Sequence, residues 1–173
     1  MQMEKGLDTG PILLQESVPI DARDTAATLH DKLAQLGARL IVRALIERPA
    51  ARAQDSALAT YAPRIDKLEP EIDWHRSAEE IERQVRAFNP SPGAYTRWGS
   101  TTLKIWDATV EPSITGQPGA VFTQDANGIV VACGRGALRI TEVQRAGAKR
   151  LAAAAFLAGT RLDPGIRLGG GDG

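Results

Sequence analysis

The sequence predicts two unlike parts, an α/β segment followed by a small antiparallel β-barrel or sandwich. In the first 48 residues, a short apolar run precedes one long helix pattern. After residue 100, at least four short β-rich runs are separated by turn residues. Between these regions, residues 49–68 are polar and alanine-rich without a clear period, which is typical of a linker.

The α/β segment begins with PILLQESVPI, residues 11–20, an apolar run bounded by prolines that predicts a strand. Residues 24–47 then carry apolar side chains at steps of three and four, with Asp24 as the expected N-cap. The stripe consists of Leu29, Leu33, Leu36, Leu40 and Ala44. This spacing predicts an amphipathic helix that packs against a sheet.

The second part opens with a shorter helix pattern that starts at a capping box from Ser77 to Glu80 and stops at Asn89-Pro90. The β-rich runs LKIWDATVE, GAVFT, GIVVA and ALRITEV follow, and then the alanine-rich helix pattern AKRLAAAAFLAG. Strands so closely spaced are typical of small antiparallel barrels. We expect the barrel domain to span residues 69–168 and residues 169–173 to be a disordered tail.

Composition limits the classes of function. The chain has 173 residues, 43% of them apolar, with 21 basic and 21 acidic residues, so no global charge favours nucleic acid or membrane. No stretch reaches the roughly 20 apolar residues of a membrane span. The single cysteine, Cys133, lies in the apolar run IVVACG, which predicts a buried residue in a reducing compartment. We therefore expect a cytoplasmic protein.

Asp8 stands in the tripeptide Asp-Thr-Gly, which is also the signature of aspartic proteases. Protease chemistry needs two such carboxylates that share a proton, and the sequence contains one. A dimer of a single motif would need a nearly all-β chain, which the long helix pattern contradicts. No metal site is predicted either, because Glu69, Glu71 and Asp73 lack further ligands at a defined spacing.

Basic residues gather locally in this neutral chain. Between residues 135 and 167, the sequence contains seven basic residues and only two acidic ones, Glu142 and Asp163. The seven are Arg135, Arg139, Arg145, Lys149, Arg150, Arg161 and Arg167. Arg64 and Lys67 in the linker add to them. Because RNA binding rests on cations that release counterions from phosphates, this cluster predicts an RNA-binding surface. A solvated basic face is the alternative.

Aromatic residues give little support for base recognition. Most of them, Phe122 included, lie in apolar periodic contexts and are expected in the core. Tyr95 and Trp98 in SPGAYTRWG are the pair that the sequence leaves as candidates for exposure. We therefore expect contacts to the RNA backbone rather than to bases.

Four segments follow one another in an order and spacing typical of a known family: GLDTGPILLQESVPI, DTAATLHDKLAQLGARLIVRAL, YAPRIDKLEPEIDWHRSAEEIERQVRAFNPSPGAYT and LKIWDA. Together they resemble the downstream portion of the methionyl-tRNA formyltransferase family. The segment from Ile72 to Tyr95 is the most diagnostic.

The resemblance implies a monomeric two-domain enzyme that transfers a formyl group from 10-formyltetrahydrofolate to methionine charged on initiator tRNA. Residues 1–48 would be the remnant of its Rossmann-like formyltransferase domain, and residues 69–168 an OB-like barrel that helps to bind tRNA. The implied tRNA-binding residues are Arg64, Lys67, Arg135, Arg139, Arg145, Lys149 and Arg150.

The family's catalytic trio is an Asn, a His and the Asp of the Leu-Asp-Thr-Gly loop, and here only that Asp occurs in its context, as Asp8. The isolated chain is therefore expected to be inactive. We expect the Asp8 carboxylate to face a concave pocket at the rim of a sheet. A carboxylate in bulk solvent, far from any pocket and from that rim, would contradict the enzymatic interpretation of this chain, and Asp8 as a mere turn-former is the alternative. A free-standing RNA-binding or structural module without catalysis is the alternative.

Overall fold

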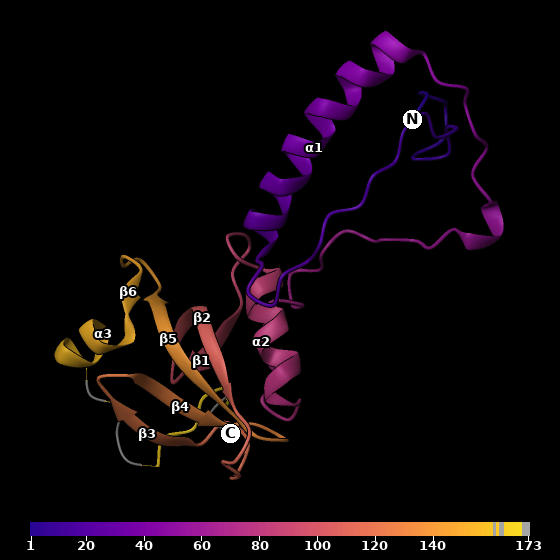
Figure 1. The fold of residues 1–173 in the computed structure, drawn as a ribbon. Helices are drawn as coiled ribbons and strands as arrows, with labels where there is room; N and C mark the ends of the chain where they lie inside the picture. The colour runs from indigo at the N-terminus through magenta and orange to yellow at the C-terminus, as the bar shows by residue number, and fades with distance from the viewer. Residues whose placement is uncertain (161, 163–164, 171–173) are drawn as a thin grey trace. The chain divides into compact units, whose positions relative to one another are not determined.

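The computed structural model describes residues 1–160, 162 and 165–170, and the chain divides into two compact units (Figure 1). The first unit is Met1–Ile65 and the second is Asp66–Gly173. The division falls inside the stretch 49–68 for which the sequence predicts a linker.

The first unit is built around one long helix, α1 (Ala26–Glu47). Its N-cap is Thr25, whose hydroxyl accepts a hydrogen bond from the Thr28 N–H at 3.3 Å. The predicted cap, Asp24, is one residue too early. Asp24 instead accepts a hydrogen bond from the Lys32 ammonium at 2.6 Å, and this bond lowers the pKa of the buried carboxyl to about 2.

The apolar stripe of α1 is only partly covered in this unit. Leu36 is buried, whereas Leu33 is 49% exposed. Further large apolar side chains are exposed along the last turns: Ile41, Val42, Leu45 and Ile46. A helix that is apolar on more than one side is typical of a helix buried among several neighbours.

The predicted strand over residues 11–20 is not formed. This segment makes only an isolated antiparallel bridge, between Ile12 and Arg52. A strand needs a continuous row of hydrogen bonds to a neighbour, and the backbone bonds of this segment in the described structure are those of Ile12 with Arg52 and that of the Pro11 carbonyl with the Gln2 N–H at 2.9 Å. The short 3-10 helix η1 (Ser56–Leu58) follows Arg52 in the chain.

The second unit contains an antiparallel sheet in the order β1-β2-β5-β4-β3, with β6 paired to the later residues of β5, Glu142 and Val143, beyond those that pair with β4 (Figure 1). Its strands are β1 (Tyr95–Trp98), β2 (Thr101–Glu111), β3 (Val121–Asp125), β4 (Gly128–Ala132), β5 (Ala137–Arg145) and β6 (Leu151–Ala152). Four of them coincide with the predicted β-rich runs. The sequence did not predict β1, and it placed the start of the last helix over β6, so that α3 is shorter (Ala153–Gly159).

The core lies between the sheet and two helices. In α2 (Ala78–Ala87), Ala78, Ile81 and Val85 are buried along one face, and the predicted capping box from Ser77 to Glu80 is present. The backbone N–H of Ser77 is the main cause that lowers the pKa of the Glu80 carboxyl to about 2. From α3, Phe156 packs edge-on against Trp98 with ring centroids 5.9 Å apart.

Residues 166–169 connect the two edges of the sheet. The Val121 N–H on β3 donates to the carbonyl of Ile166 at 3.1 Å, and the Gly169 N–H donates to the carbonyl of Arg97 on β1 at 2.9 Å. Gly169 is thus held in place, so the sequence-based boundary of a disordered tail at residue 169 is too early. Residues 171–173 of that predicted tail lie outside the described residues.

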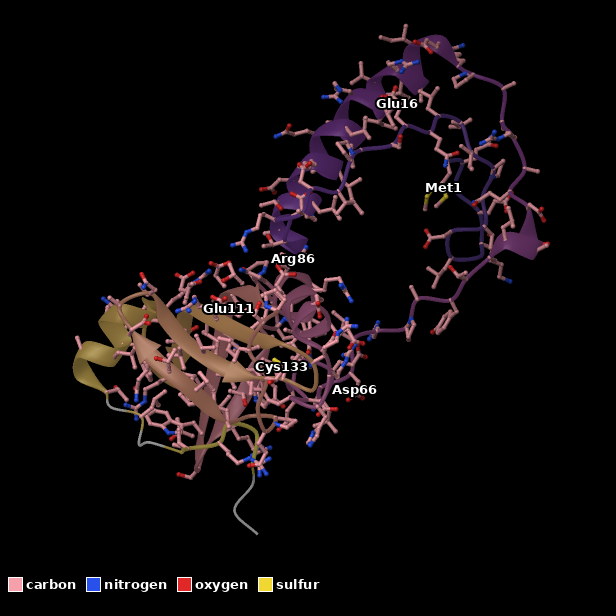
Figure 2. All side chains as sticks on the ribbon, turned by 60° about the horizontal axis from the view of Figure 1, so that its bottom comes forward. Met1, Glu16, Asp66, Arg86, Glu111 and Cys133 are labelled. Carbon is pink, nitrogen blue, oxygen red and sulfur yellow. The ribbon has the colours of Figure 1, made fainter. Side chains whose placement is uncertain are left out.

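Cys133 follows β4 and is buried in the core, with its sulfur inside the sheet unit (Figure 2). Burial raises the pKa of its thiol to about 12. The prediction of a buried cysteine is therefore confirmed. Among the described residues, none of the helices combines the length and apolarity that a membrane span requires.

Candidate functional site

The Asp-Thr-Gly loop is fixed by its backbone. Asp8 adopts a left-handed conformation with φ of +56°, which aspartate tolerates better than most residues. The side-chain amide of Gln54 donates to the carbonyls of Asp8 at 2.8 Å and of Gly10 at 2.7 Å. Gly10 is buried, and a side chain there would collide with the carbonyl oxygen of Gln2. Contacts with Gln54 and with Gln2 therefore hold the backbone of the loop.

The carboxylate of Asp8 is exposed, contrary to the expected pocket. A cavity in the described part of this unit is lined by residues 12–17, Ala50 and Arg52, and Asp8 is not among its lining residues. Neither histidine is paired with Asp8. The Nδ1 of His30 lies 3.6 Å from the Asp31 carboxylate, and the Nδ1 of His75, in the second unit, lies 2.9 Å from the Asp73 carboxylate. The geometry of this chain alone therefore supplies an oriented loop, not a complete catalytic site.

Three of the seven basic residues in the predicted cluster are paired with carboxylates in the fold. Arg135 pairs with Glu79 of α2 at 3.4 Å, and Arg150 pairs with Glu142 at 2.6 Å. Arg139 is largely buried between two further carboxylates, that of Glu111 at 2.6 Å and that of Asp125 at 3.6 Å. The excess counted along the sequence is thus much smaller in the fold, because β2, β3 and α2 bring acidic residues to it.

The turn between β5 and β6 is where unneutralised cations gather. Arg145 and Lys149 are exposed, and in the described part of the chain no carboxylate forms an ion pair with either. The guanidinium of Arg145 lies over the ring of Trp98, 5.5 Å from its centroid. Such stacking restricts a long side chain and leaves its charge facing solvent.

Lys104 joins this group, although sequence reasoning missed it. Its ammonium lies 5.6 Å from the centroid of the Trp106 ring, and the guanidinium of Arg150 lies 4.9 Å from the same centroid. Lys104 also donates to the carbonyl of Pro92 at 2.8 Å. The signal was available, since Lys104 alternates with the buried Leu103 and Ile105 on β2 and so belongs to the outer face.

The FNPSPG stretch, which belongs to the most diagnostic segment, packs against Trp106, the residue whose ring lies next to Lys104 and Arg150. The side chain of Asn89 donates to the carbonyl of Trp106 at 2.9 Å. Gly93 has φ of +87°, and a side chain there would lie 2.7 Å from the Trp106 ring. Glycine is required because the loop backbone packs directly on the indole.

The remaining candidates are dispersed. Arg64 and Lys67 are exposed in different units, on either side of the division at residue 65. Arg167 donates to the carbonyl of Pro118 at 3.0 Å. Arg161 and Asp163 lie outside the described residues. Tyr95 and Trp98 are half-buried and Phe122 is 64% exposed, so the expectations for these aromatic residues are wrong.

The acidic residues near the start of the second unit have structural partners. Glu71 accepts hydrogen bonds from the Tyr95 hydroxyl at 3.2 Å and from Arg97 at 3.0 Å. The N–H of His75 is the main cause that lowers the pKa of Asp73. Among the described residues, no group of three or more His, Cys, Asp or Glu side chains converges as metal ligands would.

Residues 64–161 match the family model described as "Formyl transferase, C-terminal domain", and residues 1–45 match the one described as "Formyl transferase". The chain belongs to the formyl transferase family.

Curated relatives are named methionyl-tRNA formyltransferase. The one from Dechloromonas aromatica is 52% identical over 168 residues, which cover 96% of this chain and 54% of the relative. The one from Chromobacterium violaceum is 48% identical over 171 residues, covering 98% of this chain and 55% of the relative. The chain thus spans about half the length of the relatives that it matches.

Solved structures of HypX from Aquifex aeolicus share the fold. One variant matches with a TM-score of 0.69 at 20% identity, over 93% of this chain and 31% of HypX. A HypX structure in complex with tetrahydrofolic acid matches with a TM-score of 0.68 at 18% identity, over 93% of this chain and 30% of HypX. At these identities the likeness concerns the fold alone.

Proposed function

We propose that this chain is the downstream half of a methionyl-tRNA formyltransferase, which transfers the formyl group of 10-formyltetrahydrofolate to the amino group of methionine on initiator tRNA. The observation that carries the proposal is the 52% identity, over 96% of this chain, to a relative of that name. The tetrahydrofolic acid bound to HypX, a protein of similar fold, agrees with a folate co-substrate.

Asp8 is the catalytic residue that we propose for this chain. Formyl transfer passes through a tetrahedral intermediate whose negative charge needs a donor, and the attacking amine must lose a proton to a base. A carboxylate supplies no donor. Asp8 would orient a histidine from the rest of the enzyme, stabilise its charge and relay protons through water. Its exposure in this chain is compatible with a surface that another part of the enzyme covers.

The 173-residue chain alone is expected to show no detectable formylation of methionyl initiator tRNA. The reason is that the family's Asn and His do not occur here in their sequence contexts. The measurement is incorporation of labelled formyl group into charged tRNA at high protein concentration. Turnover by the purified chain would refute the division of roles proposed here.

For the second unit, we infer an OB-like barrel that binds tRNA through the β5–β6 turn. Residues 166–169 support the barrel, since they bond to the edge strands β1 and β3. Arg145, Lys149 and Lys104 support the binding site, since their charges face no carboxylate in the described structure. Arg135, Arg139 and Arg150 would have to leave carboxylate partners to bind phosphate.

Binding of initiator tRNA to the 173-residue chain is expected to weaken steeply with salt, because it rests on phosphate contacts. In the double variant Arg145→Gln/Lys149→Gln, the slope of log K against log salt should become shallower by roughly 0.7–0.9 per lost contact. Fluorescence anisotropy with labelled tRNA measures both quantities.

Arg135→Gln is the matched control, because it removes one exposed cation that already faces Glu79. Arg135→Gln should change the slope less than Arg145→Gln alone or Lys149→Gln alone. A titration that is flat between low and moderate salt would contradict phosphate binding, and equal effects of all three residues would contradict the choice of the turn.

The remaining elements of the proposal follow from this activity. Residues 49–68 would connect the catalytic and the tRNA-binding domains, with Arg64 and Lys67 beside the tRNA path. A substrate used in bacterial translation initiation implies a cytoplasmic enzyme. The family resemblance implies that the intact enzyme acts as a monomer without a metal.

A further inference from the structure

We infer that Gln54 is the positioning residue of the Asp8 loop, and this inference rests on the proposed catalytic role of Asp8. Gln54 follows α1 in the sequence, whereas the Asp8 loop precedes it. The carboxamide of Gln54 bridges the two ends of this loop. Its nitrogen donates to the carbonyl oxygen of Asp8 at 2.8 Å and to that of Gly10 at 2.7 Å. One side chain thus fixes two backbone carbonyls on either side of Thr9.

The two hydrogen bonds hold a conformation that the loop would not keep by itself. Asp8 has φ of +56°, a region that costs energy for residues with a side chain. A rotation of the peptide at Asp8 would also swing its carboxylate, because both are attached to the same Cα. Gln54 therefore determines the direction of the Asp8 side chain without touching it.

Gln54 is itself held from both sides. Two residues before it, Arg52 exchanges backbone hydrogen bonds with Ile12 at 2.8 and 2.9 Å. Directly after it, the Asp55 carboxylate caps η1 by accepting the Ala57 N–H at 2.9 Å. The amide nitrogen of Gln54 is thus presented at a fixed place, as a positioning residue requires.

The test uses the full-length enzyme that contains this chain and compares four variants. Gln54→Glu is nearly isosteric but replaces the donor by an acceptor that repels both carbonyls. Gln54→Lys restores a donor on a side chain of similar reach. Gln15→Glu makes the same chemical change nearby, at a residue that only accepts a hydrogen bond, from Arg52 at 3.0 Å. Asp8→Asn reports on the proposed function itself.

Gln54→Glu should lower kcat by about 10- to 100-fold with the KM for tRNA unchanged, because a misplaced catalytic group slows the chemical step rather than binding. Gln54→Lys should recover most of the loss, and Gln15→Glu should behave as the unchanged enzyme. Steady-state formylation assays and thermal unfolding of each variant give these values.

The outcomes separate the two claims. If Asp8→Asn retains normal turnover, the proposed function of Asp8 fails. If Asp8→Asn is impaired and Gln54→Glu is not, or if Gln54→Lys is as impaired as Gln54→Glu, the positioning role of Gln54 is refuted while that of Asp8 stands. A rise in KM without a fall in kcat would also refute the positioning role.

Discussion

Replacement of Asp8 by asparagine in a full-length enzyme that contains this chain is expected to lower kcat by about 10²- to 10⁴-fold. The reason is that an amide can neither stabilise an imidazolium nor relay a proton as a carboxylate does. Folding should change little, because Asp8 is exposed and asparagine also tolerates its φ of +56°. Steady-state formylation assays and thermal unfolding measure the two effects separately.

Asp31→Asn is the matched control for this substitution. Asp31 lies on α1 in the same unit, and its side chain is 78% exposed. The same chemical change there should leave kcat within about twofold of the unchanged enzyme, as at surface sites in general. Near-normal turnover of Asp8→Asn would overturn the catalytic assignment.

Trp74→Ala should destabilise the second unit by about 3–5 kcal/mol, the usual cost of truncating a buried tryptophan. Trp74 is 3% exposed, and its indole N–H donates to the hydroxyl of the fully buried Thr96 at 2.9 Å. Gly169 packs against the same ring, since a side chain there would lie 2.7 Å from it. The substitution leaves a cavity, an unpaired hydroxyl and a loosened segment between the sheet edges.

Cys133 provides the measurement, because its thiol is buried in this unit and has a pKa raised to about 12. The thiol should react with a labelling reagent only after the unit opens. Labelling as a function of urea should therefore show a lower midpoint for Trp74→Ala. Phe122→Ala removes an aromatic ring that is 64% exposed and should leave the midpoint nearly unchanged. Equal midpoints for the two variants would contradict the role of Trp74.

The second unit was largely predictable because its signals are local. The capping box from Ser77 to Glu80 depends on residues three apart, and β4 (Gly128–Ala132) is a single apolar run after an Asn-Gly turn. The sequence missed β1 (Tyr95–Trp98), since it has few apolar residues and is defined by its pairing with β2. The backbone bonds that residues 166–169 make to β3 and β1 are likewise long-range, so they carry no local signal in the sequence.

The first unit shows where such prediction stops. The pattern of α1 is local, so the helix was predicted to within two residues at its start. The strand over residues 11–20 was wrong, because a strand depends on hydrogen bonds to segments that its own sequence does not specify. The exposure of Asp8 has the same cause: a loop motif gives the chemistry of a side chain and not its surroundings.

For the candidate site, counting charges along the chain overestimated the number of cations that stay without a carboxylate partner in the fold. Arg145 and Lys149 were in the predicted cluster and remain unneutralised in the described structure. Arg139 was in it as well, but β2 places the carboxylate of Glu111 at 2.6 Å from it. Only pairing between distant strands reveals such neutralisation. Gln54 was missed because its hydrogen bonds reach 44 and 46 residues back along the chain.

The central claim is that this chain supplies Asp8 and a tRNA-binding domain to a formyltransferase whose other catalytic residues lie in the family's upstream segment. The most direct measurement joins the upstream half of the Dechloromonas aromatica relative to this chain and assays formylation of methionyl initiator tRNA. We predict turnover by the joined protein and none by the chain alone. A joined protein that folds and binds tRNA but transfers no formyl group would contradict the claim, and so would turnover by the chain alone.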